Sequence, residues 1–108
     1  MRPWFLCVLF AALMGYRAGH AASGVEIFQG ADLSLGGRLM QENRCAQCHI
    51  EKFGGDGSSI YRPAGRINTP GRLRGMVEQC NTELTLGLFP EEVTALAALL
   101  QRDHYRFK

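Results

Sequence analysis

The chain has 108 residues, which is enough for one small domain. With 12 basic and 10 acidic side chains its formal net charge is only +2. A balance this close to neutral excludes the strongly basic class of nucleic-acid-binding proteins, and we expect no nucleic-acid partner.

The first 21 residues have the features of a secretory signal peptide. Arg2 gives a positively charged start, residues 4–14 form an almost unbroken apolar run, and Gly19-His20-Ala21 offers small residues where a signal peptidase cleaves. The apolar run is well short of the ~20 residues that a membrane-spanning helix needs. Retention as a membrane anchor stays the alternative, because Arg17 is an unusual charge so near the cleavage point.

Removal of residues 1–21 changes the charge of the protein. Arg2 and Arg17 leave with the signal, whereas no acidic residue does. The side chains of residues 22–108 therefore balance in charge, and these residues are expected to form one domain that is soluble after export.

A first helix is predicted to begin at Asp32 or Ser34, either of which can cap it, and to run directly into a cysteine motif. Its apolar residues recur at helical spacing on one face: Leu35, Leu39 and Met40. Gly36 and Gly37 lie inside this helix, where each glycine costs about 1 kcal/mol relative to alanine. We expect that another helix approaches closely at these glycines.

The motif Cys45-Ala46-Gln47-Cys48-His49 has the spacing at which a c-type haem is attached. Each thiol can form a thioether with a vinyl group of the porphyrin, and the adjoining imidazole then reaches one face of the iron. The sequence predicts haem attachment through Cys45 and Cys48, with His49 as an iron ligand.

Two other uses of paired cysteines fit less well. A thioredoxin-type dithiol leaves His49 without a purpose and lacks the β-strand that precedes such a motif. A structural zinc site needs four ligands, and beyond the motif residues 22–108 offer only Cys80 and His104.

Residues 50–68 show no helical periodicity, and a turn cluster occupies residues 54–59, so we expect a loop. Three apolar side chains of this loop can contact the haem: Tyr61, Pro63 and Ile67. The carbonyl region of Pro63 can meet the second ring nitrogen of His49, a contact that orients such a ligand. The alternative is that Pro63 is a turn residue only.

A second helix is predicted to begin with Thr69 as cap and Pro70 at the first helical position. Its apolar stripe recurs at helical spacing: Leu73, Met76, Val77, Cys80 and Leu84. On this stripe, Cys80 is expected to be a buried, unreactive thiol. Four arginines lie nearby in the sequence: Arg62, Arg66, Arg72 and Arg74. Either one or two of them pair with haem propionates, or all four form a solvated face with no specific partner.

Residues 81–89 are predicted to form a loop over the second face of the haem. The last helix begins with Pro90-Glu91-Glu92, which suits a helix N-terminus. Its apolar stripe is Val93, Leu96, Ala97 and Leu100, and its alanines allow tight contact with Gly36 or Gly37. The tail at residues 104–108 can fold back on the domain.

Together these elements resemble the class I cytochrome c family over about residues 31–101. The likeness is carried by Gly37-Arg38-Leu39-Met40 before the motif and by Pro90-Glu91-Glu92-Val93 with Leu96-Ala97-Ala98-Leu99-Leu100 near the end. The resemblance implies a small all-α fold of about three helices around one covalent haem c and its iron. It also implies a cytochrome c domain at 22–108 that transfers single electrons in a bacterial periplasm.

The second iron ligand is left open by the sequence. In the family a methionine usually precedes the last helix, but residues 81–89 contain none. Met76 is our first candidate, and Met40 is too near the proximal side. Asn81, an empty position and His104 are the other possibilities.

The identity of the second iron ligand distinguishes two possible functions. A strong sixth ligand makes a closed electron carrier, a monomer that exchanges electrons with redox partner proteins, and this function is favoured. A weak or absent ligand makes a protein that binds nitric oxide, oxygen or carbon monoxide, as a sensor does. The residues predict no independent enzyme, because no nucleophile–base pair or carboxylate pair is recognisable.

Overall fold

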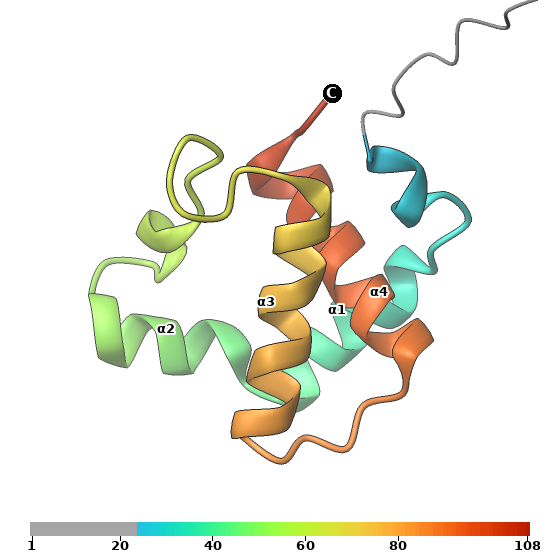
Figure 1. Ribbon diagram of the computed structural model, residues 1–108. Coiled ribbons are helices and arrows are strands. Elements are labelled where there is room, and N and C mark those ends of the chain that lie inside the picture. Colours follow the sequence, from blue (N-terminus) through green and yellow to red (C-terminus); the bar gives the residue numbers. More distant parts are fainter. Residues whose placement is uncertain (1–23) are drawn as a thin grey trace, which may run out of the picture.

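The computed structural model describes residues 24–108, so the predicted signal peptide lies outside the described residues. Over these residues the chain is all-helical, with four α-helices: α1 (Leu33–Glu42), α2 (Cys45–Phe53), α3 (Pro70–Glu83) and α4 (Pro90–Leu100) (Figure 1). Three short turns complete it: η1 (Val25–Phe28), η2 (Ser58–Ile60) and the π-helical η3 (Gln101–Tyr105). The all-α class is confirmed. In this range, no helix is both long and apolar enough to span a bilayer.

The predicted helix starts are confirmed in atomic detail. The Asp32 carboxylate accepts a hydrogen bond from the Leu35 N–H at 3.0 Å, and the Thr69 hydroxyl accepts one from the Arg72 N–H at 3.2 Å. Pro70 and Pro90 are the first residues of α3 and α4. These side chains satisfy amides that have no partner inside the helix, which is why short local patterns locate the starts.

The first and last long helices cross at Gly36, as expected. A methyl group added at Gly36 would lie 2.9 Å from the carbonyl carbon of Ala95, closer than such atoms approach. At Gly37 an added methyl group would meet nothing within 4 Å. Only the first of the two glycines is therefore required by the crossing of α1 and α4.

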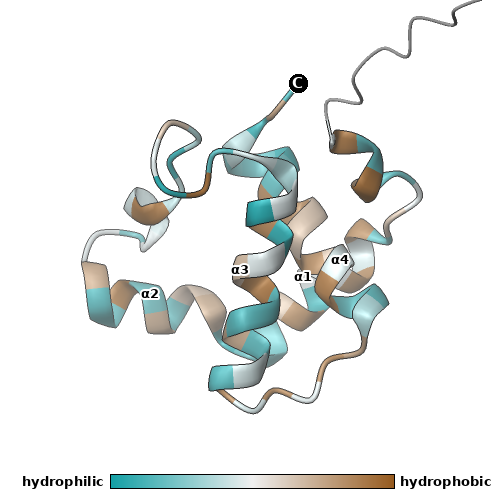
Figure 2. Ribbon diagram, in the orientation of Figure 1, coloured by the Kyte–Doolittle hydropathy of each residue, from teal (hydrophilic) through white to brown (hydrophobic). Residues whose placement is uncertain are grey.

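The buried core is centred on α4, which Figure 2 shows as mostly hydrophobic. All four residues of its predicted stripe are buried: Val93, Leu96, Ala97 and Leu100. Ala97 and Leu100 pack with Leu73 of α3 and with Tyr105 of η3, which are 1% and 5% exposed. The guanidinium of Arg74 ties α3 to α4, since it donates to the Thr94 hydroxyl at 2.9 Å and to the Pro90 carbonyl at 3.1 Å.

One prediction that the structure corrects concerns α2. The first helix does not run directly into the cysteine motif, because it ends at Glu42 and Arg44 has a left-handed backbone (φ 51°). A separate helix then continues to Phe53, so residues 50–53 are helical and not part of a loop. Gly54, with φ 77°, ends it. Residues 24–108 thus contain four α-helices where about three were expected.

A second correction concerns Asn81, which was placed in a loop. The helix α3 continues to Glu83, and the Asn81 side chain is 8% exposed. Its amide donates to the Leu88 carbonyl at 3.1 Å and accepts from the Leu88 N–H at 2.9 Å. Asn81 therefore pins the loop that joins α3 to α4.

Candidate functional site

The three chemically distinctive residues of the motif share the first turn and a half of α2. Cys45 and Cys48 are three residues apart and His49 follows at four, so all three lie on one side of the helix. The left-handed Arg44 turns α2 away from α1 before this turn begins, and the Cys48 N–H bonds to the Arg44 carbonyl at 3.1 Å. The break between the helices therefore sets the direction in which the motif faces.

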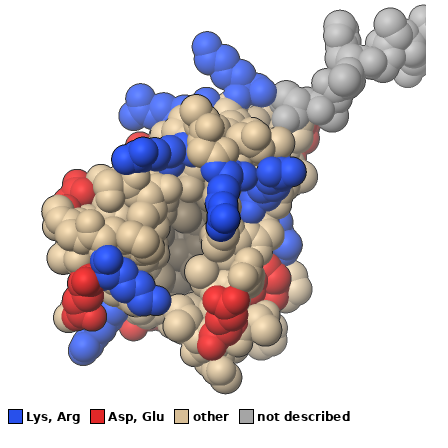
Figure 3. Space-filling view, turned by 60° about the vertical axis from the view of Figure 1, so that its left-hand side comes forward, with Lys and Arg blue, Asp and Glu red and all other residues tan. Residues whose placement is uncertain are grey.

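The motif faces a cavity of about 750 Å³ between α2 and α3. Figure 3 shows the hollow in the surface of the molecule. One wall carries Cys45, Cys48 and His49, and the opposite wall is mainly apolar and belongs to α3 and α4: Leu73, Met76, Val77, Cys80, Leu96 and Leu100. The charged side chains that line the cavity are Lys52, Arg62, Arg66 and Glu83. We call this space the large cavity.

The large cavity fits a haem by three independent features. Its volume lies within the roughly 300–1,000 Å³ that cofactor and ligand pockets occupy. Its lining is mainly apolar, like the faces of a porphyrin, and its cationic side chains suit propionate carboxylates. Two thiols and an imidazole stand together on one wall, which is the donor set of covalent haem attachment. Across residues 24–108, no three His, Cys, Asp or Glu side chains are grouped to hold a metal ion.

Cys80 is half-buried at the wall of the large cavity, so it is less buried than predicted. Burial, followed by the charge of Glu83, raises the pKa of the Cys80 thiol. Burial also raises the pKa of Cys45, and Cys80 contributes to that rise. A third thiol therefore stands on the wall opposite the motif, within electrostatic reach of it.

The partner of His49 is Tyr61. The Tyr61 hydroxyl lies 2.6 Å from Nδ1 of His49, and the two rings meet nearly edge to face with their centres 5.4 Å apart. Pro63 is exposed and does not line the cavity, so of its two predicted alternatives the contact with His49 is wrong. The sequence had marked Tyr61 only as an apolar side chain. Its hydroxyl was the available signal, because a half-buried tyrosine usually finds a hydrogen-bond partner.

The electrostatics of this pair keep both rings neutral near neutral pH. Burial, and then the charge of Lys52, lowers the pKa of His49. Burial is the main cause that raises the pKa of Tyr61, with Cys45 next. An uncharged imidazole can offer a lone pair to a metal, and an uncharged phenol can accept a hydrogen bond.

The arginines that were predicted as one group divide into two. Arg62 and Arg66 line the large cavity, and Arg62 also donates to the Ser59 carbonyl at 3.0 Å. Arg72 donates to the Arg66 carbonyl at 3.4 Å, whereas Arg74 joins α3 to α4. Only the first two are placed to meet the carboxylates of a bound group.

The candidates for a second iron ligand are also separated by the structure. Met76 lines the large cavity and is 41% exposed, so it is not a filler of the buried core. Asn81 lines neither described cavity, and both ends of its amide are already bonded. His104 stacks on Tyr61, with ring centres 4.5 Å apart, and does not line the large cavity. Met40 lines the large cavity as well, together with His49.

Comparison with protein-family models, with characterised proteins and with solved structures finds no match to this chain. The motif, the cavity and the chemistry of their residues are therefore the evidence for function.

Proposed function

We propose that this protein is a periplasmic monohaem c-type cytochrome that carries single electrons between redox partner proteins. The observation that carries the proposal is the placement of Cys45, Cys48 and His49 on one wall of a largely apolar cavity of about 750 Å³. The two thiols would hold haem c covalently, and Nε2 of His49 would bind its iron. A haem supplies a ferric/ferrous couple, which exchanges one electron without bond rearrangement.

The residues around the large cavity have separate tasks under this proposal. Leu73, Val77 and Leu96 exclude water, and an apolar surrounding favours the iron state of lower charge. Arg62 and Arg66 would bind the propionates through charge-assisted hydrogen bonds. Phe53 and Leu84 line the cavity and are each 55% exposed, which leaves an apolar opening where a partner protein can approach.

Met76 is our proposed sixth ligand for the carrier. A thioether is a neutral, soft donor that stabilises ferrous iron and raises the reduction potential. Of the two methionines among residues 24–108, only Met76 lies on α3, across the cavity from His49. Because Met76 is exposed at the cavity wall, it has no packing role in the buried core.

A potentiometric titration of the purified holoprotein tests the carrier function. The visible spectrum should change reversibly with a one-electron slope, and carbon monoxide should leave the reduced spectrum unchanged. N-terminal sequencing of the periplasmic fraction tests export and should find a chain that begins near Ala22. Recovery of an intact Met1 species in membranes would indicate a tethered cytochrome instead.

The second candidate is a haem protein that binds a small gaseous ligand at an open sixth position. It is favoured by the hydrogen bonds of Asn81. Because both ends of the Asn81 amide already bond to the backbone of Leu88, Asn81 supplies no iron ligand. Met76→Leu decides between the two, because it removes the sulfur while keeping the volume. In the carrier it should open the haem to carbon monoxide and lower the potential. Ready binding of carbon monoxide by the wild type, with no change in Met76→Leu, would favour the gas-binding function.

A further inference from the structure

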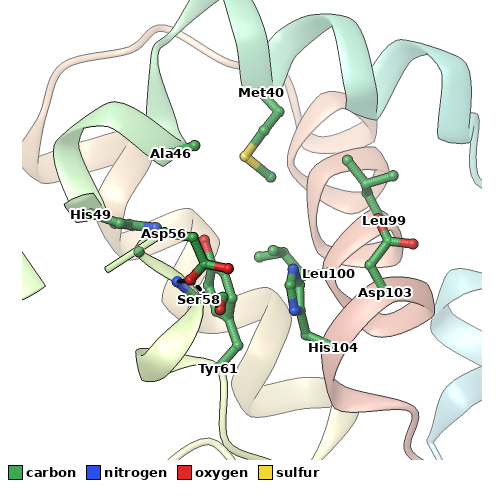
Figure 4. A pocket seen from close by; sticks show the side chains of 11 residues that line it. Met40, Ala46, His49, Asp56, Ser58, Tyr61, Leu99, Leu100, Asp103 and His104 are labelled. Atoms are coloured by element: carbon green, nitrogen blue, oxygen red, sulfur yellow. Dashed lines mark hydrogen bonds between the residues drawn. The ribbon is translucent and has the colours of Figure 1, made fainter. Parts of the chain in front are cut away.

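A second cavity, of about 210 Å³, adjoins the proximal histidine (Figure 4). We call it the small cavity. His49 and Tyr61 form one wall, and their 2.6 Å contact lies there. Asp103 and His104 come from η3 at the C-terminal end of the described chain, and Figure 4 shows His104 turned toward Tyr61. The C-terminal turn is thereby brought beside the histidine of the motif, far away in sequence.

The direction of the hydrogen bond follows from the chemistry of the ring. A histidine that gives the lone pair of Nε2 to iron carries its proton on Nδ1. Nδ1 must therefore donate, and the Tyr61 oxygen must accept. The proton of the phenol then remains free to point into the small cavity, whose volume is far above the roughly 10–15 Å³ that one water requires.

The position of Tyr61 depends on the C-terminal turn. Its ring lies 4.5 Å from the ring of His104, at 35°, and 6.0 Å from that of Tyr105, at 63°. Tyr105 is anchored in the core and stacks on Phe107, with ring centres 5.4 Å apart. The turn is closed by Gln101, whose amide donates to the Phe107 carbonyl at 2.8 Å and accepts from its N–H at 3.0 Å.

We propose that Tyr61 is a positioning residue for His49, and that the C-terminal turn acts on the reduction potential through Tyr61. This inference rests on the proposed haem function and adds a regulation of the same site. A hydrogen bond from Nδ1 fixes the plane of the ring and makes Nε2 a stronger donor. A stronger donor stabilises ferric iron, so the bond lowers the potential. The rings of His104 and Tyr105 keep the hydroxyl in reach of Nδ1.

The first test is Tyr61→Phe in the haem-loaded protein, which keeps the ring and removes only the hydroxyl. At a fixed solution potential the ratio of ferrous to ferric haem should rise at least about threefold, which is roughly 30 mV for a one-electron couple. Thr94→Val is the control, because it also removes a hydroxyl, one that bonds to Arg74 and Pro90 and lines neither cavity, and it should leave the ratio unchanged. An unchanged ratio in Tyr61→Phe would overturn the proposal.

The second test asks whether the turn acts through that hydroxyl. His104→Ala should raise the ferrous fraction in the wild type, but should add nothing in the Tyr61→Phe background, because the group it positions is then gone. Equal effects of His104→Ala in both backgrounds would show an independent action of His104 and would refute the role of the turn.

A third measurement needs no substitution. In the diamagnetic ferrous protein the Nδ1 proton of His49 should exchange slowly with water and show a nuclear Overhauser effect to the Tyr61 ring. Fast exchange without that effect would contradict the hydrogen bond. All three measurements presuppose a covalent haem bound by His49. Its absence would refute the proposed function itself, whereas a normal haem with none of these effects would refute only this inference.

Discussion

Gly57 lies directly against His49. A methyl group added at Gly57 would be 2.9 Å from Cβ of His49 and 3.0 Å from the backbone nitrogen of Ile50. The glycine also has a left-handed backbone, with φ 80°. The turn after α2 can therefore pack directly against α2 only because residue 57 has no side chain.

The substitution Gly57→Ala should destabilise the protein and displace His49. The left-handed backbone alone costs about 1–2 kcal/mol for a residue with a Cβ, and the contact with His49 adds to that. Gly55→Ala is the matched control, because Gly55 also has a positive φ (59°) but an added methyl group meets nothing there. Thermal melts of the holoprotein should rank the wild type above Gly55→Ala and Gly55→Ala above Gly57→Ala. Equal melting temperatures of the two variants would contradict the contact.

The crossing of α1 and α4 yields a test on two adjacent glycines. Gly36→Ala should destabilise the protein by about 1–3 kcal/mol, because the methyl group would overlap the backbone at Ala95. Gly37→Ala should instead stabilise it by up to about 1 kcal/mol, since alanine favours a helix and the space is open. Denaturant unfolding measures both. Effects of the same sign and size would show that the helices do not cross at Gly36.

Cys80 should react slowly with thiol reagents in the native holoprotein. Beyond Cys45 and Cys48 it is the only cysteine in residues 22–108, and a haem in the large cavity would cover it. Because burial raises the pKa of Cys80, less of it is thiolate at any given pH, so its labelling should require a higher pH than that of an ordinary thiol. Labelling followed from pH 7 upward, with the urea-unfolded holoprotein as reference, should be several times slower in the native state. Equal rates would refute the location of Cys80.

Much of the fold could be predicted from the sequence because its signals are local. Asp32, Thr69 and the two prolines mark helix starts through contacts within three residues, and the stripe of α4 repeats at helical spacing. The predicted turn cluster is confirmed by the positive φ angles of Gly54, Gly55 and Gly57.

The errors arose where distant residues decide the local structure. Asn81 looks like a helix end, but its amide bonds Leu88 seven residues later and is buried in α3. Tyr61 contacts His49, 12 residues earlier, from a position where aromatic rings of the distant η3 pack against it. Residues 50–53 carry no stripe of their own, so nothing in their spacing indicated that α2 continues to Phe53.

The mass of the intact protein, made with a c-type maturation system and measured after acid–acetone extraction, tests the central claim most directly. Attachment through Cys45 and Cys48 predicts the mass of a chain that begins near Ala22 plus one haem. The same addition should appear in Cys80→Ala, which removes the thiol on the opposite wall of the large cavity, and not in a Cys45→Ala/Cys48→Ala variant. The mass of the bare chain, with the haem recovered in the extract, would contradict covalent attachment and the function proposed from it.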